Sequence, residues 1–191
     1  MKLNNTYFLL RHGQARSNEY NFVSCWPEKV YNPLTQKGIK KTKEVALILK
    51  KEKIDLIFTS DLLRTKQTAE IIAKKLGLNI LFDRNLREIK FGKFNGGPGE
   101  KWEDFFEIIR NKKSGKFYGM ENYKDIRKRT KIFIKKINKK YKNKKILIVS
   151  HGAMVFSLES TMRNLSEKQE KIRKEELKFK NGELKKLVIG N

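Results

Sequence analysis

Short apolar runs separated by longer segments of mixed character are the main pattern along the chain. Three of these runs, residues 7–10, 54–59 and 146–150, are mostly aliphatic or aromatic. Continuous apolar runs of this length are typical of strands that are covered on both faces. We therefore predict that all three are buried strands.

Segments with helical periodicity lie between these runs. Residues 36–51 place Ile39, Val45, Ala46 and Leu49 on one side of a helix, and the apolar pattern of residues 63–76 stops before Gly77, a typical C-terminal signal. The same pattern predicts further helices at residues 101–110, 123–141 and 152–165, and a short strand near residues 78–82. Strands that alternate with helices indicate a layered α/β domain.

The C-terminal segment differs from this alternation. Asn181–Gly182 stands between two runs with partial alternation, LKFK and ELKKLV. Asn-Gly is a strong hairpin signal, so we predict an antiparallel hairpin added at a sheet edge. The 191 residues have the size of one ordinary domain, and we expect residues 1–191 to form a single unit with one core.

The net charge of +24 is weaker evidence for a polyanionic partner than its size suggests. Such a charge is typical of proteins that bind nucleic acids or anionic membranes. Of the 45 basic residues, however, 35 are lysines spread over every segment. We therefore expect no specific nucleic-acid partner, although a phosphorylated small molecule would be attracted by the field.

The cysteine content and the lack of long apolar runs bear on the compartment. Cys25 is the one cysteine, which excludes an internal disulfide and a zinc site made of four cysteines. The apolar stretch before Arg11 is short, and no run approaches the roughly 20 apolar residues of a membrane span. We expect a cytoplasmic protein without a membrane partner, and the sequence leaves its oligomeric state open.

The two histidines of the chain have the same local context. His12 follows one predicted strand as Arg11-His12-Gly13, and His151 follows another as Ser150-His151-Gly152. In open α/β sheets, ligands bind beyond the carboxyl ends of the strands. A single histidine there would most simply be a solvated turn residue, but two matching placements predict one shared site.

An anion suits this site better than a metal ion does. Two imidazoles can bind zinc, yet Arg11 lies beside one of them and no carboxylate or thiol is near in sequence. A guanidinium offers a planar pair of donors to phosphate oxygens, and Arg64 follows a further predicted strand. We therefore expect no metal and no cofactor. A surface ion pair is an equally good interpretation of Arg64 taken alone.

At this point the chain resembles the histidine phosphatase superfamily, branch 1, also described as phosphoglycerate-mutase-like. The resemblance spans nearly the whole chain and rests on five strings in the family's order. The matching residues are Arg11, His12, Gly13 and Asn18; Pro33, Leu34, Thr35 and Gly38; Ser60, Asp61, Leu62, Arg64, Gln67, Thr68 and Ala69; Glu88; and Ser150, His151 and Gly152.

The resemblance implies a three-layer α/β/α sandwich with a mainly parallel central sheet. It implies that His12 is the nucleophile that becomes a phosphohistidine and that Glu88 is the general acid and base. Arg11, Asn18, Arg64, His151 and Gly152 would then bind the phosphate. Without the resemblance, Glu88 is as well explained as a solvated carboxylate paired with a neighbouring arginine or lysine.

Three residues depart from the family's pattern. Ala15 stands where a serine or threonine is common, Asn95 replaces a frequent glutamate, and Asn122 stands at a usual serine. We expect residues 14–34, together with a lid-like insertion around residues 93–123, to line the substrate pocket. The departures leave the substrate open.

The predicted function is a phosphatase that hydrolyses phosphomonoesters of a small metabolite. The resemblance implies that cofactor-dependent mutases carry extra segments over the sugar acid, for which 191 residues leave little room. A phosphoglycerate-mutase-type phosphotransferase is the first alternative. The second alternative is a basic protein without catalytic activity that binds nucleic acid or another polyanion. It predicts salt-sensitive binding and no phosphate release.

Overall fold

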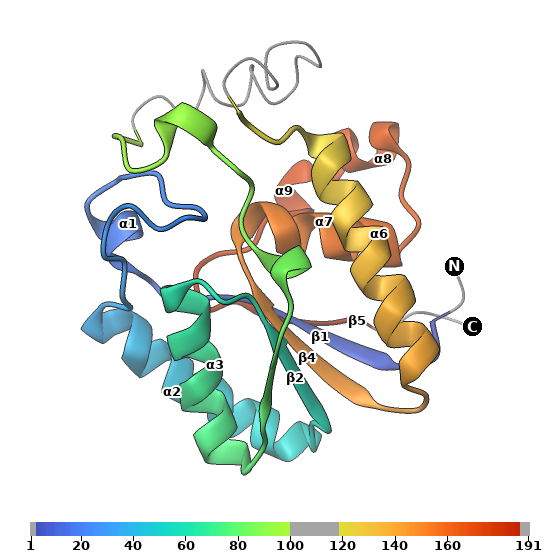
Figure 1. Ribbon diagram of the computed structural model, residues 1–191. Coiled ribbons are helices and arrows are strands. Elements are labelled where there is room, and N and C mark those ends of the chain that lie inside the picture. Colours follow the sequence, from blue (N-terminus) through green and yellow to red (C-terminus); the bar gives the residue numbers. More distant parts are fainter. Residues whose placement is uncertain (1–2, 100–118, 188–191) are drawn as a thin grey trace.

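The computed structural model describes residues 3–99 and 119–187 and shows a five-stranded sheet with helices on both faces (Figure 1). The strand order is β3-β2-β4-β1-β5. The strands are β1 (Thr6–Arg11), β2 (Leu56–Thr59), β3 (Ile80–Phe82), β4 (Lys145–Ser150) and β5 (Leu184–Leu187). All neighbouring pairs are parallel except β1 and β5. The predicted α/β fold with a mainly parallel sheet is confirmed.

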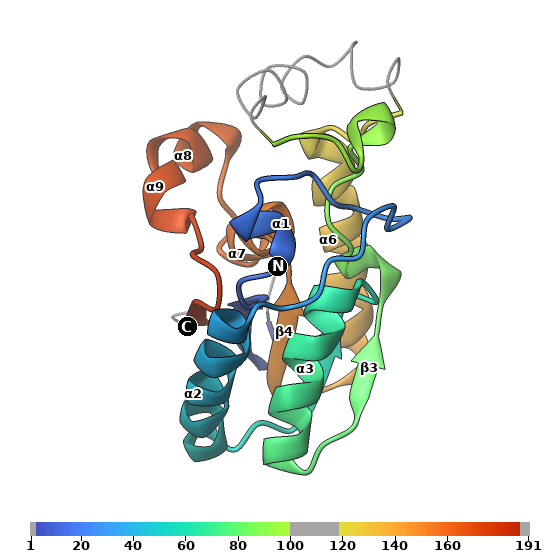
Figure 2. The same cartoon turned by 90° about the vertical axis from the view of Figure 1, so that its left-hand side faces the viewer.

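The helices form the two outer layers. In Figure 1, α2 (Gln36–Glu52) and α3 (Leu63–Leu76) lie on one face of the sheet, and α6 (Tyr123–Lys140) and α7 (Gly152–Met162) lie on the other. Figure 2 shows α2 and α3 side by side. Short helices α1 (Arg16–Glu19), α8 (Glu167–Ile172) and α9 (Lys174–Leu177) and the 3₁₀ turns η1 (Arg84–Leu86) and η2 (Gly92–Phe94) lie in the connections.

The alternation of side chains along the strands divides the interior between the two faces. In β1, Tyr7 and Leu9 pack in the cluster that includes side chains of α6 and α7, whereas Phe8 and Leu10 pack in the cluster that includes side chains of α2 and α3. Successive strand residues point to opposite faces, so both faces of a sheet covered by helices must be apolar. This explains why the strands read as unbroken apolar runs.

Most helices agree with the sequence-based expectation. The helix α3 ends at Gly77, whose backbone is left-handed with φ 69°. The helix α7 ends at Met162, three residues before the predicted Leu165. The predicted helix at residues 101–110, and most of the predicted lid-like insertion, lie outside the described residues.

The predicted antiparallel addition at the C-terminus is present, but its geometry differs from a simple hairpin. Strand β5 pairs with β1, and residues 178–180 form no strand. The Phe179 carbonyl instead accepts a hydrogen bond from Arg11 Nη1 at 2.9 Å. The turn itself is docked on the end of β1, because the Gly182 N–H donates to the carbonyls of Arg11 and His12 at 3.1 and 3.0 Å.

Gly38 joins the start of α2 to the loop after His12. A Cβ at this position would clash with the Gln14 carbonyl and would lie 2.8 Å from the Gln14 nitrogen. Thr35 caps α2 by accepting a hydrogen bond from the Gly38 N–H at 3.1 Å. The glycine of the Pro-Leu-Thr string is therefore required for a close approach between two backbones.

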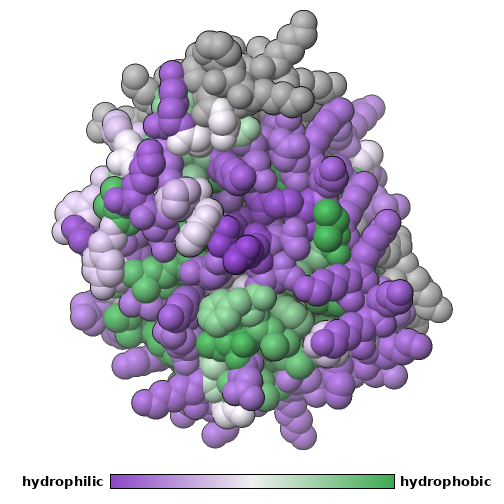
Figure 3. Space-filling model, viewed as in Figure 1, coloured by the Kyte–Doolittle hydropathy of each residue, from purple (hydrophilic) through white to green (hydrophobic). Residues whose placement is uncertain are grey.

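The surface is mostly hydrophilic, as Figure 3 shows for one face. Within residues 3–99 and 119–187, no helix is long and apolar enough to cross a membrane.

Candidate active site

The pairing of β1 with β4 brings the two histidines together. Arg11 and Ser150 are the last residues of these strands and face each other in the parallel register. The His12 N–H continues the ladder by donating to the Ser150 carbonyl at 2.9 Å. His12 and His151 therefore leave the sheet side by side, and the centroids of their rings are 5.3 Å apart. The structure thus brings the two imidazoles together, as their matching positions after two strands predicted.

The hydrogen bonds of His12 define its tautomer. Its Nδ1 lies 2.7 Å from the Gly13 carbonyl, which only accepts, so Nδ1 carries the proton. Its Nε2 lies 3.2 Å from Arg64 Nε, whose N–H donates to the nitrogen lone pair. The lone pair of the neutral ring is therefore on Nε2, where it accepts the hydrogen bond from Arg64.

Burial and the charges around His12 keep its ring neutral. The side chain is 2% exposed. Burial, and then the positive charges of Arg64 and Arg11, lower the pKa of His12 well below its ordinary value of 6.5. At neutral pH the ring therefore retains the lone pair that an attack on phosphorus requires.

His151 is held differently. It is fully buried, and its Nε2 lies 3.1 Å from the Ser60 hydroxyl. Its Nδ1 has no hydrogen-bond partner among the described residues. Burial, followed by the nearby arginines and His12, lowers the pKa of His151 well below 6.5 as well. A buried nitrogen without a partner is costly, and an anion with a proton-bearing or acceptor oxygen would satisfy it.

The two arginines come to the site from different elements, a strand and a helix. Arg64 lies in the first turn of α3 and is 3% exposed. Arg11 ends β1, and its buried Nε has no hydrogen-bond partner in the described part of the chain. The backbone of Gly152, at the start of α7, lies close to this guanidinium: a Cβ there would be 3.5 Å from Arg11 Nε.

The start of α7 adds further attraction for an anion. His151 is its N-cap residue, and no side chain caps the helix. The first N–H groups of a helix and its dipole favour negative charge. The arrangement of two guanidiniums, two neutral imidazoles and a helix start therefore suits a tetrahedral oxyanion.

Glu88 reaches this site from the segment after β3. The Ser150 hydroxyl fixes this segment by donating to the Leu86 carbonyl at 2.7 Å, and Arg129 Nη1 donates to the Arg87 carbonyl at 3.0 Å. Burial raises the pKa of Glu88, whereas Arg64 and Arg11 act in the opposite direction. A carboxyl group with a raised pKa beside two guanidiniums is suited to proton transfer. Glu88 is partly buried, and the arginines that act on its pKa are those of the site together with Arg129.

Asn18 lies at the edge of the site and is exposed. Its Oδ1 accepts hydrogen bonds from the Ala15 N–H at 3.0 Å and from Asn181 Nδ2 at 3.1 Å. The turn that carries Asn181 also contacts the His12 carbonyl, so the C-terminal segment holds Asn18 next to the end of β1.

The three departures from the family's pattern have structural explanations. Ala15 is buried, and the Asn18 side chain makes the hydrogen bond to its N–H. Asn122 is the N-cap of α6, with a capping box completed by Asp125. Asn95 is 6% exposed and holds the loop around Cys25, accepting from the Cys25 N–H at 2.9 Å and donating to the Pro27 carbonyl at 2.6 Å.

The sequence analysis assigned no role in the site to two serines that contact its histidine and arginine side chains. Ser60 follows β2, the third strand to end at this edge, and contacts His151; its position after a strand was a usable signal. Ser24 lies in a loop without periodicity, and its Oγ and carbonyl accept from Arg64 at 3.3 and 3.0 Å.

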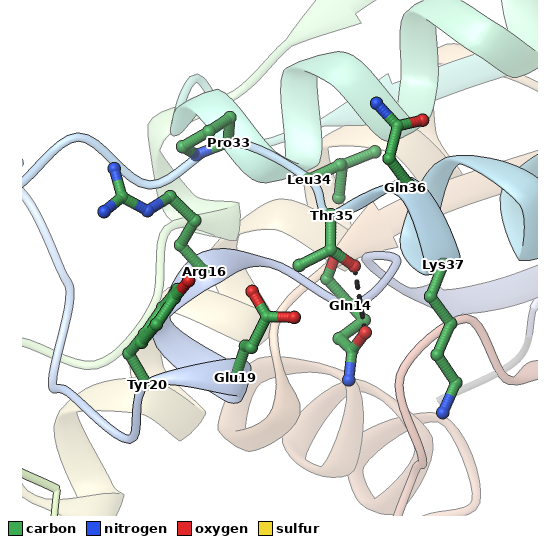
Figure 4. A pocket seen from close by; sticks show the side chains of 9 residues that line it. All are labelled: Gln14, Arg16, Glu19, Tyr20, Pro33, Leu34, Thr35, Gln36 and Lys37. Atoms are coloured by element: carbon green, nitrogen blue, oxygen red, sulfur yellow. Dashed lines mark hydrogen bonds between the residues drawn. The ribbon is translucent and has the colours of Figure 1, made fainter.

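A surface groove of about 560 Å³ opens beside the loop after Gly13 (Figure 4). Gln14 and Thr35 hydrogen-bond to each other at its wall, with 2.9 Å between their side-chain oxygens. Part of the segment 14–34 therefore lines a groove, but neither histidine does. The groove is separate from the candidate active site.

The structure is an α/β protein whose site brings two guanidiniums and two imidazoles together, an arrangement suited to an oxyanion. Comparison with known proteins gives the family: the histidine phosphatase superfamily (branch 1) matches residues 7–190. The chain belongs to this superfamily, as the sequence motifs predicted.

Individual relatives carry different names. The chain is similar to an uncharacterized phosphatase, PhoE, of Bacillus subtilis, with 32% identity over 150 residues that cover 78% of this chain and 73% of the relative. It is also similar to a probable phosphoglycerate mutase, GpmB, of Escherichia coli, with 29% identity over 165 residues, 83% of this chain and 74% of the relative.

Among solved structures, the α-ribazole phosphatase of Shigella flexneri has a TM-score of 0.80 at 20% identity, covering 97% of this chain and 91% of that one. At this identity the likeness shows the fold.

Proposed function

We propose that this protein is a phosphatase that hydrolyses phosphomonoesters of a small metabolite through a phosphohistidine on His12. One observation carries the proposal: the neutral His12 has Nε2 beside Arg64, and its ring lies 5.3 Å from that of His151. Among the described residues, the buried Arg11 Nε and His151 Nδ1 have no hydrogen-bond partner. Phosphoryl transfer asks a protein mainly for positioning and for stabilisation of the charge on the phosphoryl oxygens.

In the first step, Arg64 Nε turns its hydrogen bond from His12 Nε2 to a phosphoryl oxygen. The freed lone pair of Nε2 attacks phosphorus, and the bond from phosphorus to the leaving oxygen breaks. Arg11, Arg64 and His151 hold the three remaining oxygens, with the Gly152 backbone and Asn18 at the margin. Glu88, in its protonated form, gives its proton to the leaving oxygen, so the alcohol departs uncharged.

In the second step, the Glu88 carboxylate takes a proton from water. The water oxygen bonds to phosphorus, the P–N bond breaks, and the electron pair returns to His12 Nε2. The phosphohistidine thereby splits one difficult hydrolysis into two displacements. Glu88 regains its proton and is ready for the next cycle.

A mutase would carry out the same first step and then return the phosphate to another hydroxyl. The curated relatives include both a phosphatase and a probable mutase by name. Phosphate release to water, measured in the presence of a sugar acid as competing acceptor, separates the two activities. A basic protein without catalytic activity would release no phosphate in either case.

Glu88→Gln tests the acid–base role. With an alkyl phosphate, whose leaving oxygen needs a proton, we expect kcat to fall by about 10²–10³-fold. Formation of the phosphoenzyme from p-nitrophenyl phosphate, whose leaving group departs as an anion, should be affected much less. In the wild type, kcat/KM for the alkyl phosphate should fall as the pH rises through the raised pKa of Glu88, because the acid form is lost.

In the Glu88→Gln variant, the decrease of kcat/KM with rising pH should be absent. Glu44→Gln, which removes an exposed carboxylate from α2, is the matched control and should behave like the wild type. Wild-type turnover of the alkyl phosphate by Glu88→Gln would show that another group transfers the proton.

A further inference from the structure

The guanidinium of Arg64 is held by more than His12. While its Nε donates to His12 Nε2, its Nη2 donates to the Ser24 carbonyl at 3.0 Å. Its Nη1 donates to the Ser24 hydroxyl at 3.3 Å and lies 3.5 Å from Glu28 Oε1. Both residues lie in the loop between α1 and α2, which carries no secondary structure around them.

Glu28 is also attached to the helix that carries Arg64. Its Oε2 accepts a hydrogen bond from the Leu63 N–H at 2.9 Å. Leu63 begins α3, and the N-cap residue Leu62 makes no side-chain cap. The carboxylate of Glu28 therefore caps this helix from 35 positions away in the sequence, and the cap and the ion pair act on consecutive residues.

Asn95 fixes the loop from its other side. Its amide accepts from the Cys25 N–H and donates to the Pro27 carbonyl. A glutamate, the residue frequent at this position of the motif, only accepts when it is ionised and cannot make the second hydrogen bond. The asparagine is thus matched to a loop that presents Ser24 on one side and Glu28 on the other.

We infer that Glu28 is a positioning residue, which holds the Arg64 guanidinium in the orientation that faces His12 Nε2. The inference rests on the proposed function for its catalytic consequence. Two further residues support this orientation. Ser24 accepts hydrogen bonds from the two Nη atoms of Arg64, and Asn95 holds the loop in place.

The charge balance of the site gives the physical reason. Glu28 and Glu88 are the carboxylates that act on the buried Arg64. Glu88 must carry a proton before each first step, so it cannot serve as a constant counter-charge. Glu28 accepts from both Arg64 and Leu63, which is the pattern of an ionised carboxylate. Burial raises the pKa of Glu28, whereas the Leu63 N–H and Arg64 lower it and so favour the carboxylate. In this form Glu28 compensates Arg64 while Glu88 changes its protonation state.

Glu28→Gln separates positioning from support of the loop. The amide oxygen of glutamine still accepts from the Leu63 N–H, so the loop stays docked, whereas the ion pair with Arg64 is lost. We expect kcat with p-nitrophenyl phosphate to fall by about tenfold, since a small misplacement of a phosphate-binding group is expensive in rate. The melting temperature should change little. Glu70→Gln is the control, because it removes an exposed carboxylate from α3, the helix that carries Leu63 and Arg64.

A spectroscopic readout reports the orientation directly. Because the chain has two histidines, the ¹⁵N spectrum of the imidazoles contains two sets of signals, which His151→Ala assigns. Glu28→Gln should shift the His12 Nε2 signal as Arg64 turns away, and leave the His151 signals nearly in place. Ser24→Ala, a smaller change to the same clamp, should shift the His12 signal in the same direction and lower kcat a few-fold.

Wild-type kcat and an unchanged His12 signal in Glu28→Gln and Ser24→Ala would overturn the inference. If Glu28→Gln does not fold, Ser24→Ala decides by the same two measurements. If the wild type itself releases no phosphate, the proposed function fails, but the ¹⁵N shift still decides whether Glu28 orients Arg64.

Discussion

Replacing His12 by alanine is expected to abolish phosphate release, lowering kcat by at least about 10³-fold. The variant keeps the guanidiniums and so still binds inorganic phosphate, but it has no nitrogen to accept the phosphoryl group. Steady-state release from p-nitrophenyl phosphate measures the loss, and the phosphate-induced shift in melting temperature measures the remaining binding.

His151→Ala is the informative comparison. His151 has its Nε2 bound to Ser60 and has only Nδ1 free among the described contacts, so we assign it to binding and not to attack. It should lower kcat by about 10²-fold and still form a phosphoenzyme. Turnover by His12→Ala near the wild-type rate would contradict the assignment of the nucleophile.

Arg64→Ala is expected to have the second-largest effect, with a loss of about 10²–10³-fold in kcat. The variant loses a charged donor to the developing phosphoryl charge and the N–H that Arg64 directs at His12. It also leaves Glu28 without its ion-pair partner, so the melting temperature must be measured in parallel. Kinetics with p-nitrophenyl phosphate give the loss in kcat and in kcat/KM.

Arg64→Lys should rescue little of this activity. A lysine ammonium is a point charge without the planar fork that donates to His12, to the Ser24 carbonyl and to the Ser24 hydroxyl at once. Arg84→Ala, which removes an exposed arginine from η1, serves as the control. Full activity of Arg64→Lys would mean that charge alone suffices, and equal activity of Arg64→Ala and Arg84→Ala would remove Arg64 from the mechanism.

The sequence predicted the strands and the placement of the histidines because apolar runs end visibly at Arg11 and Ser150. It did not define which strands are neighbours: β4 lies between β1 and β2, although it comes fourth in the chain. The convergence of His12 and His151 depends on that order. Periodicity does not define the order of the strands, whereas the resemblance to the family implied the fold that brings the two histidines together.

Other parts of the site were beyond sequence reasoning because they depend on contacts between distant segments. Glu28 meets Leu63 and Arg64 from a loop without periodicity, and Asn95 supports that loop from about 70 positions away. The C-terminal turn was found from Asn181–Gly182, but its partner was not. The Gly182 N–H donates to the carbonyls of Arg11 and His12 at the end of β1, and no local sequence pattern indicates this contact.

Trapping the phosphoenzyme tests the central claim most directly. The wild type is mixed with a phosphomonoester, quenched rapidly in alkali, and analysed by ³¹P NMR and by mass spectrometry of its peptides. Because Nδ1 of His12 is held by the Gly13 carbonyl, we predict that the phosphate is on Nε2 of His12. Phosphate on Nδ1, on His151 or on a hydroxyl group would contradict the account.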